Sequence, residues 1–437
     1  MTGQFPDESL PALFEAVSGE DRIALAVSGG SDSMALLHLA LRHARAGGPA
    51  LHVLTVDHGL REGSAGEAAA VAAFCAGQGV THETLHWLRP PGDTGNLSSD
   101  AREGRYGLMA RACAVRGIGT LLTGHTLDDQ AETVLMRLGR GSGVDGLAAM
   151  RPVTRLWGLR IVRSLLGQTR APLRAMLAHA GIAWSEDPTN DDRSYARIEA
   201  RAALAALAPL GITSQRLAET ANAMEDARTV LDERATVLAA ETCAAMPLGH
   251  VILRPAPLSA APRETAHRLL ARLLCAVSGN AYRPRREALA GLLARMAGVG
   301  FGGATLHGCR IDPLKDGRIA IQREPQACAA SLPATGPGVW DARFDVVLPN
   351  PLDGARIAAT GEGGLRLLKR AEAPLPPCWT RAPRPARACT PALWRGADLL
   401  AIPLAGYHPA PEASECRAAA RYPAGITVVD PAREDFI

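Results

Sequence analysis

The stretch RIALAVSGGSDSMALLHLALRHAR, residues 22–45, decides the fold. Residues 22–28 form a short apolar run that ends at a pair of glycines, as a buried parallel strand does. Residues 32–45 then place apolar side chains at helical spacing. Asp32 lies near the start of this segment, where the positive end of the helix dipole stabilises a carboxylate. The stretch therefore predicts a strand, a tight turn and a helix.

The same alternation continues along the next hundred residues. Three more strand-like and three more helix-like segments follow in turn, at 51–57, 63–78, 82–88, 99–116, 120–125 and 127–137. Regular alternation of strand and helix predicts a Rossmann-like parallel sheet covered by helices on both faces. Ligands of such sheets bind at the carboxyl ends of the strands, so the polar residues that follow each strand are the candidates for a site.

The pattern changes at about residue 211. Residues 213–240 and 263–298 are expected to be helical, residues 301–324 to form hairpins, and residues 331–339 to be a linker. The last hundred residues are short segments rich in proline and glycine. We therefore expect an α/β protein with three domains: the parallel-sheet domain at 1–212, a mainly helical domain at 213–330 and a small mixed α/β domain at 340–437.

The composition is that of a soluble globular protein, since 47% of the 437 residues are hydrophobic and 21% are charged. The N-terminus lacks the pattern of a secretory signal, and no apolar run approaches the ~18 residues that span a bilayer. None of the nine cysteines belongs to a C-x-x-C pair, which argues against a zinc site, an iron–sulfur cluster or a disulfide framework. We expect a cytoplasmic protein that does not enter a membrane.

The turn after the first strand has the composition of a phosphate site. It reads Ser28, Gly29, Gly30, Ser31, Asp32 and Ser33. Glycines let the backbone turn sharply and approach a ligand closely, and N–H groups at a helix start point at negative oxygens. The serine hydroxyls add donors, and Asp32 could hold Mg²⁺ against phosphate. A glycine pair alone would indicate only a turn. The loop is not a Walker A motif, because the Gly-Lys-Ser/Thr ending is missing.

This hexapeptide resembles the PP-loop of the ATP pyrophosphatases, which bind the pyrophosphate part of ATP and transfer AMP to an oxygen of the substrate. That superfamily includes amide-forming synthetases, tRNA thiolases and lysidine synthetases. Residues 124–133 read GHTLDDQAET and resemble the G-H-x-x-D-D-Q-x-E-T signature of the tRNA(Ile)-lysidine synthetases. The resemblance implies that residues 1–212 form the catalytic domain and that the two later domains bind tRNA.

Asp129 and Glu132 lie three apart on a predicted helix, so they share a face. Two adjacent carboxylates repel each other unless a cation lies between them. The ammonium of lysine is such a cation, and the resemblance implies that these two residues bind it. The alternative is an acidic helix start that complements the dipole. His125, at the strand end, could polarise the substrate or stabilise the transferring phosphoryl group, or it could be a packed or capping residue.

Three more blocks resemble the family. Residues 57–61, with Asp57 and His58, are similar to its V-D-H-G-L-R segment beside the nucleotide pocket. Residues 101–106 are similar to its A-R-x-x-R-Y helix, where Arg102 and Arg105 lie one turn apart and suit phosphate or base contacts, unless they form an exposed basic face.

The third block is residues 186–190 with 197–201, which resemble the D-P-(S/T)-N and R-x-x-x-R region. Arg197 is the candidate for contact with the transition state or the activated base. The chain departs from the family pattern at Thr126, where many members have a second histidine, and at Glu199, between Arg197 and Arg201.

The charge distribution favours a basic C-terminal half. Residues 1–210 hold 20 Arg against 22 acids, a balance of −2, whereas residues 211–437 hold 27 bases against 22 acids, a balance of +5. Two runs are strongly basic: 137–174 has eight Arg and one acid, and 366–395 has seven bases and one acid. Such runs are often solvated surfaces. In an enzyme that acts on RNA they become candidate phosphate contacts, and we expect Arg201, Arg366 and Arg370 to contact tRNA.

The resemblance implies a ligase that uses ATP and Mg²⁺. It would adenylate the wobble cytidine of tRNA(Ile) with a CAU anticodon and then let free L-lysine displace AMP. The sequence does not decide whether the protein is a monomer or a homodimer. A tRNA thiolase would be expected to carry a cysteine pair, and an amide-forming synthetase would need an ammonia source with a Cys/His arrangement. A non-enzymatic RNA-binding protein would not need the loop, Asp129 and Glu132 together.

Overall fold

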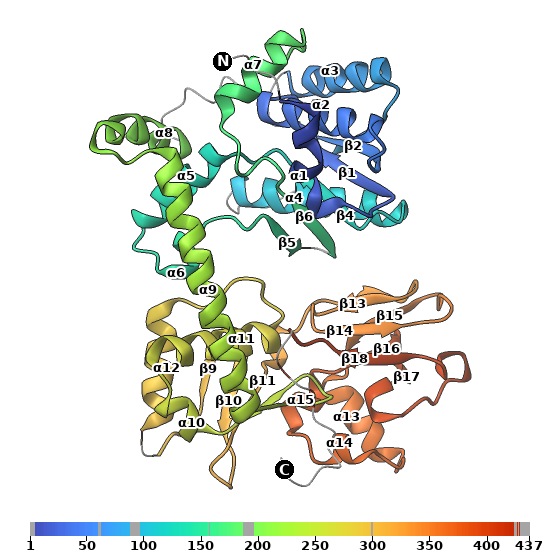
Figure 1. The fold of residues 1–437 in the computed structure, drawn as a ribbon. Coiled ribbons are helices and arrows are strands. Elements are labelled where there is room, and N and C mark those ends of the chain that lie inside the picture. Colours follow the sequence, from blue (N-terminus) through green and yellow to red (C-terminus); the bar gives the residue numbers. More distant parts are fainter. Residues whose placement is uncertain are drawn as a thin grey trace. The chain divides into compact units, whose positions relative to one another are not determined.

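The computed structural model describes residues 5–59, 63–87, 97–156, 158–186, 196–298, 300–423, 426 and 428. The chain divides into two compact units, Met1–Arg228 and Thr229–Ile437 (Figure 1). Within the described residues no helix is long and apolar enough to cross a membrane.

The first unit contains a six-stranded sheet with the order β3-β2-β1-β4-β6-β5. Its strands are β1 (Arg22–Ala26), β2 (Ala50–Asp57), β3 (Thr81–His86), β4 (Thr120–Thr123), β5 (Val153–Leu156) and β6 (Leu159–Val162). Strand β1 is central, since its Leu25 pairs in parallel with Val53 of β2 and Leu122 of β4. The predicted parallel sheet is confirmed. The edge hairpin β5–β6, whose β6 runs parallel to β4, was not predicted.

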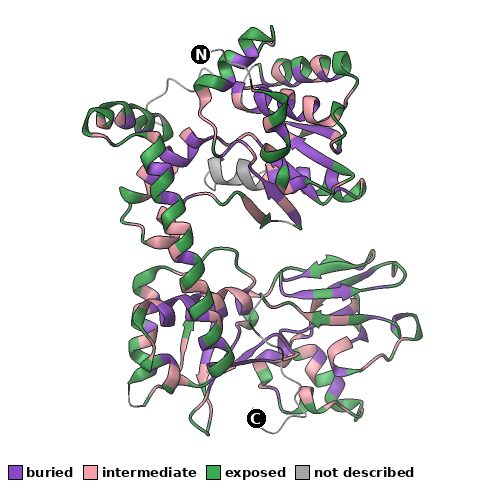
Figure 2. Ribbon diagram, viewed as in Figure 1, coloured by how far each residue is buried: buried purple, intermediate pink, exposed green. Residues whose placement is uncertain are grey.

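Helices cover both faces of this sheet. They are α2 (Ser31–Arg45), α3 (Ser64–Gln78), α4 (Leu97–Val115) and α7 (Arg170–His179). Helix α5 (Leu127–Leu138) follows β4. The alternation along β1 explains the two layers: Ile23 and Leu25 pack with α2, α3 and α7, whereas Ala24 packs with α4 on the other face. These strands and helix faces are buried (Figure 2).

The connections fix the place where a ligand binds. From β1 the chain proceeds to β2 and β3 on one side and then crosses to β4 on the other side. The carboxyl ends of β1 and β4 therefore border the point at which the strand order reverses, and open α/β sheets bind ligands at this point.

The described part of the first unit also contains the α-helices α1 (Leu10–Leu13), α6 (Val144–Leu147), α8 (Ala196–Leu207) and the first half of α9 (Ser214–Thr242). Helices α5, α8 and α9 share a small core that includes Val134, Leu204 and Ala221. This packing places α8 beside α5.

The second unit begins within α9 and contains α10 (Pro255–Ala260), α11 (Arg263–Ser278) and α12 (Arg286–Ala297). Its first sheet has the order β7-β8-β11-β10-β9, with β7 (Cys243–Ala245), β8 (Val251–Leu253), β9 (Ala304–Leu306), β10 (Cys309–Pro313) and β11 (Ile319–Arg323). The hairpins and the helix expected at 213–240 are present, whereas the stretch 263–298 forms two helices, α11 and α12, with non-helical residues 279–285 between them. Strands β7 and β8 were not predicted, because each has only three residues.

Two more sheets and three short helices follow. The sheets have the orders β12-β15-β16-β17 and β13-β14-β18. Their elements are β12 (Leu332–Pro333), β13 (Gly338–Trp340), β14 (Phe344–Val347), β15 (Ala355–Ala359), α13 (Gly361–Arg370), α14 (Pro377–Thr380), α15 (Arg384–Ala388), β16 (Pro391–Arg395), β17 (Asp398–Ala401) and β18 (Arg417–Ala420). The mixed α/β character is confirmed. The segment expected as a linker forms β12 and β13. The domain boundaries at 212 and at 330–340 stay predictions.

Candidate active site

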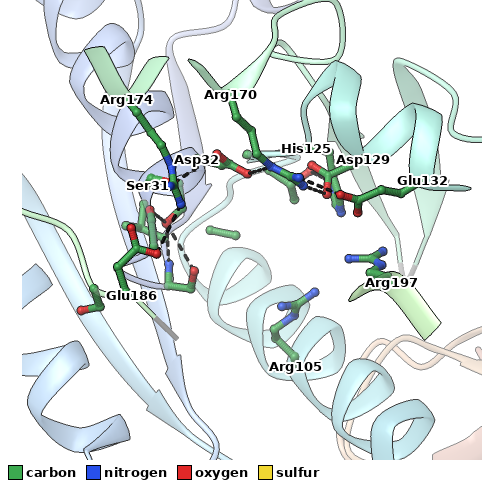
Figure 3. Close-up of a pocket in the computed structure, with 18 of the residues that line it drawn as sticks. Ser31, Asp32, Arg105, His125, Asp129, Glu132, Arg170, Arg174, Glu186 and Arg197 are labelled. Carbon is green, nitrogen blue, oxygen red and sulfur yellow. Dashed lines mark hydrogen bonds and ion pairs between the residues drawn. The ribbon is translucent and has the colours of Figure 1, made fainter. Parts of the chain in front are cut away.

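A pocket of about 450 Å³ lies at the carboxyl ends of β1 and β4 (Figure 3). Its walls come from the β1–α2 turn, the end of β4 and helices α4, α5, α7 and α8. The pocket brings together most of the residues singled out from the sequence, namely Ser28, Gly30, Ser31, Asp32, Ser33, Arg105, His125, Asp129, Glu132, Arg197 and Arg201.

The loop of residues 28–33 is held in shape by hydrogen bonds within the loop and by one from Ser185. Gly29 has a φ of +90°, which favours glycine, and its carbonyl oxygen accepts a hydrogen bond from the Ser185 N–H at 2.9 Å. The Ser33 hydroxyl donates to the Gly30 carbonyl oxygen at 2.9 Å and accepts from the Ser28 N–H at 3.1 Å. Helix α2 begins in this loop without a side-chain cap. Its first N–H groups thus form the arrangement that binds anions at helix N-termini.

A cation does lie between Asp129 and Glu132, and it is Arg170 (Figure 3). The Arg170 Nη2 lies 2.5 Å from Asp129 Oδ1, and its Nη1 lies 2.7 Å from Glu132 Oε1. Its Nε donates to Asp32 Oδ2 at 2.9 Å, so one guanidinium connects the 28–33 loop with Asp129 and Glu132 of α5. Burial lowers the pKa of Arg170, but the three carboxylates outweigh this effect, so its pKa is raised and the group stays charged.

Asp129 also caps helix α5. Its Oδ2 accepts hydrogen bonds from the N–H of Thr126 at 2.8 Å and from the Thr126 hydroxyl at 2.9 Å. Burial raises the pKa of Asp129, yet the charge of Arg170 and the Thr126 hydrogen bonds outweigh burial and lower the pKa overall. The Thr126–Asp129 capping box is thus present together with the cation contact, and it gives Thr126 a local function. Asp129 also lies in the first turn of α5, as the alternative of an acidic helix start expected.

Glu132 is almost completely buried, with 1% of its side chain exposed. Its Oε1 accepts from Arg170 and from the Nε of Arg201, the latter at 3.0 Å. Its Oε2 is buried without a hydrogen-bond partner among the described residues. A buried oxygen of a carboxylate without a partner is costly, about 1–3 kcal/mol or more for a charged group, so this atom indicates a place for a donor.

Both Asp32 and its neighbour Ser31 in the 28–33 loop contact arginines of α7. Burial raises the pKa of Asp32, and the charge of Arg170 offsets this effect only in part. The Arg174 Nε donates to the Ser31 hydroxyl at 3.1 Å, and its Nη2 lies 3.3 Å from Glu186 Oε2. Arg170 and Arg174 therefore both contact the 28–33 loop.

Three more of the predicted residues line the pocket, and two lie in the second unit. In His125 the Nδ1 lies 2.9 Å from the Thr123 hydroxyl, and Arg105 and Arg197 line the pocket. Arg366 and Arg370 are exposed on α13 of the second unit. The side chain of Arg102 lies outside the described residues.

Asp57 and His58 are not among the described residues that line the pocket. Asp57 Oδ1 accepts from the Ser64 hydroxyl at 2.7 Å and from the Gly59 N–H at 3.0 Å, and these two bonds lower its pKa. Asp57 is therefore bonded to Ser64, the first residue of α3. Its expected contact with ATP, and that of His58, stay predictions.

Sequence reasoning missed Arg170 and Arg174, although both belong to the basic run 137–174. The run splits in the structure: Arg151 pairs with Glu225 at 3.1 Å and Arg160 with Glu20 at 2.9 Å, away from the pocket. The useful signal was position. Helix α7 follows β6, the parallel strand beside β4, so its start lies at the same edge of the sheet.

Residues 6–207 match the family model described as a PP-loop domain. A tRNA(Ile)-lysidine synthase from Ruegeria pomeroyi is 46% identical over 388 residues, which are 88% of this chain and 89% of the relative. The chain belongs to the tRNA(Ile)-lysidine synthase family. Another tRNA(Ile)-lysidine synthase, from Mesorhizobium japonicum, is 38% identical over 403 residues, 90% of this chain and 86% of the relative. The resemblance to this family drawn from residues 28–33 and 124–133 is confirmed.

A solved structure also resembles the chain, the U34-tRNA thiolase NcsA from Methanococcus maripaludis with its 4Fe–4S cluster. The match has a TM-score of 0.44 and 18% identity, and it covers 50% of this chain and 78% of that chain. A likeness at this level carries no conclusion about the reaction of a tRNA(Ile)-lysidine synthase family member.

Proposed function

We propose that this chain is a ligase that converts the wobble cytidine of tRNA(Ile) with a CAU anticodon to lysidine, using ATP and L-lysine. Family membership makes it an ATP-using enzyme that modifies tRNA. One observation carries the proposal: the 28–33 loop and the buried carboxylates Asp129 and Glu132 meet in a single pocket. A phosphate site next to a cation site is what the joining of a nucleotide-activated base to an amine requires.

The 28–33 loop and the start of α2 would hold the phosphates of ATP. Arg174, which donates to Ser31, adds positive charge at this loop. The donor set also suits Mg²⁺. Among the described residues no three His, Cys, Asp or Glu side chains gather to hold a metal, but Mg²⁺ commonly takes one carboxylate together with substrate phosphates, and Asp32 supplies one at the loop. The bound ion would neutralise phosphate charge.

The reaction would consist of two substitutions. The 2-carbonyl oxygen of cytidine attacks the α-phosphorus of ATP, and pyrophosphate leaves. The ε-amine of lysine then attacks C2 of the base, AMP leaves with that oxygen, and the amine gives up a proton. In this scheme Asp129 and Glu132 bind an ammonium of lysine, and the unpartnered Glu132 Oε2 accepts from it. His125 and Arg197 would stabilise charge at the transferring phosphoryl group and the base.

The tRNA would be bound by basic side chains of both units. Arg102, Arg105 and Arg201 would contact phosphates near the splayed anticodon base, since Arg105 and Arg201 already line the pocket. Arg366 and Arg370 would contact phosphates elsewhere on the tRNA. We also propose that the protein is located in the cytoplasm. Analytical ultracentrifugation of the purified chain would show whether it forms a homodimer.

ATP–pyrophosphate exchange tests the order of these steps. The proposal expects exchange only when tRNA(Ile) is present, because the adenylated group is the base. Exchange with lysine alone, without tRNA, would indicate adenylation of the amino acid and would overturn the proposal. A thiolase would instead transfer sulfur to the tRNA, which mass spectrometry of the nucleosides would detect.

A further inference from the structure

Arg170 occupies the cation position of the proposed lysine site. Its guanidinium contacts Asp129 Oδ1 and Glu132 Oε1 at 2.5 and 2.7 Å, and these oxygens belong to the same two carboxylates to which the proposed function assigns the substrate ammonium. An ammonium that binds Glu132 Oε2 and Asp129 would approach the positive charge of Arg170 closely. Protein and substrate therefore present rival cations for one pair of carboxylates.

The same side chain reaches the nucleotide site. Its third contact is Asp32 of the 28–33 loop, at 2.9 Å, and Arg174, one turn further along α7, contacts Ser31 of that loop. Arginines favour phosphate oxygens, to which they donate two parallel hydrogen bonds. A polyphosphate bound in the loop would thus bring several negative charges within reach of Arg170.

The backbone of Arg170 is held by a hydrogen bond, whereas its side chain borders two pockets. The Arg170 N–H donates to Asp128 Oδ2 at 2.8 Å, which anchors the start of α7. The side chain borders the pocket of about 450 Å³ and also a second pocket of about 510 Å³, whose apolar wall includes Leu204 and Ala208. Open space therefore borders the Arg170 side chain in both pockets.

We propose that Arg170 competes with lysine for Asp129 and Glu132, and that a polyphosphate bound to the 28–33 loop draws Arg170 off these carboxylates. Lysine then binds strongly only after the nucleotide. This inference rests on the proposed function, because it assigns lysine to the two carboxylates. If the carboxylates are open in about 1–10% of molecules before nucleotide binds, the apparent affinity for lysine is about 10- to 100-fold weaker than in the nucleotide complex.

The alternative is a fixed counter-ion, in which Arg170 only neutralises three carboxylates. If Arg170 is a fixed counter-ion, the affinity for lysine should be the same with and without the nucleotide. The same should hold for a variant that lacks Arg170. Coupling between two sites is reciprocal, so competition also predicts that lysine strengthens nucleotide binding by the same factor.

Calorimetric titration of the full chain with lysine separates the two cases. The nucleotide is α,β-methylene-ATP with Mg²⁺, which cannot release pyrophosphate. For the wild type we expect the analogue to strengthen lysine binding about 10- to 100-fold. In Arg170→Gln the lysine affinity without the analogue should rise to the value of the wild-type complex, and the dependence should vanish. Arg174→Gln is the matched control: it lies on the same helix but does not contact Asp129 or Glu132, so at saturating analogue it should keep the dependence.

Wild-type lysine binding that is indifferent to the analogue would overturn the competition, as would an Arg170→Gln variant with the wild-type dependence. If Arg170→Gln does not fold, as judged by circular dichroism, Arg170→Lys replaces it and should show weaker coupling of the same sign; wild-type coupling in that variant would contradict the proposal. Failure of the proposed function gives a different result, because lysine would then bind in neither state, or Glu132→Gln would bind it as the wild type does.

Discussion

Gly124 packs directly on the backbone of Asp32. A methyl group added at Gly124 would lie 2.9 Å from the Asp32 carbonyl oxygen and 3.0 Å from the Cα of Ser33. The end of β4 and the 28–33 loop are therefore in contact at a distance that only glycine allows. Gly124, the glycine of the G-H-x-x-D-D signature, thus helps to maintain the shape of the 28–33 loop.

Gly124→Ala should consequently weaken nucleotide binding. Overpacking of this kind costs about 1–3 kcal/mol, and here it displaces the loop, so we expect ATP affinity to fall by about 5- to 150-fold. Gly119→Ala is the control, because an added methyl at Gly119, just before the same strand, meets no atom within 4 Å. Equilibrium binding of α,β-methylene-ATP measures both variants. Equal affinities would contradict the role given to this contact.

Glu132→Gln should raise the KM for lysine while adenylated tRNA still forms. A buried charge-assisted hydrogen bond contributes about 1.5–3 kcal/mol, which corresponds to a change of about 10- to 150-fold. Glu132 is a cleaner test than Asp129, since Asp129→Asn would also weaken the Thr126 cap and lower the melting temperature. Steady-state kinetics at varied lysine gives the answer, and an unaltered KM would count against the lysine site.

Neutralising Arg366, Lys369 and Arg370 together should flatten the salt dependence of tRNA binding. All three are exposed on α13, whose Leu368 is buried in the core on the opposite face. The log–log slope should fall by roughly 0.7–0.9 for each lost phosphate contact. The control neutralises Arg310, Lys315 and Arg318 of the β10–β11 hairpin, where Arg310 and Arg318 pair with acids of their own hairpin. If the two triple variants have the same slope, the basic side chains of α13 do not contact tRNA phosphates.

Much of the first unit could be predicted from the sequence because its signals are local. The apolar run of residues 22–28, the glycine pair and the helical spacing after Asp32 each depend on neighbours in the chain, and β1 and α2 form there. The carboxylate pair on α5 was found for the same reason. Its need for a cation followed from charge alone.

The identity of that cation could not be predicted, because Arg170 meets Glu132 only through the order of the strands. Residues 151–163 carry short four-residue strands with arginines in them, so their place in the sheet depends on pairing with β4, which no local pattern encodes. The double use of Asp129, as helix cap and as partner of Arg170, likewise depends on where α7 packs.

His250 predicts a loss of stability in acid. Complete burial lowers its pKa to about 4, and its Nδ1 has no hydrogen-bond partner among the described residues. The unfolded chain keeps a pKa near 6.5 and binds the extra proton first, so the free energy of unfolding falls as the pH decreases from about 6.5 to about 4, by up to about 3 kcal/mol. His250→Gln should remove this part of the pH dependence, whereas His179→Gln, at an exposed position, should not. Chemical denaturation at several pH values measures it, and identical profiles for wild type and His250→Gln would refute the assignment.

Transfer of labelled L-lysine to tRNA tests the central claim most directly. The purified chain is incubated with ATP, Mg²⁺, labelled lysine and a tRNA(Ile) transcript with a CAU anticodon, and the digested nucleosides are analysed by mass spectrometry. The predicted result is one lysine per tRNA, attached at C2 of the wobble cytidine, with one AMP and one pyrophosphate released, and no transfer to a transcript with uridine at that position. ATP-dependent modification without lysine in the product, or no modification of this tRNA by a folded enzyme that binds ATP, would contradict it.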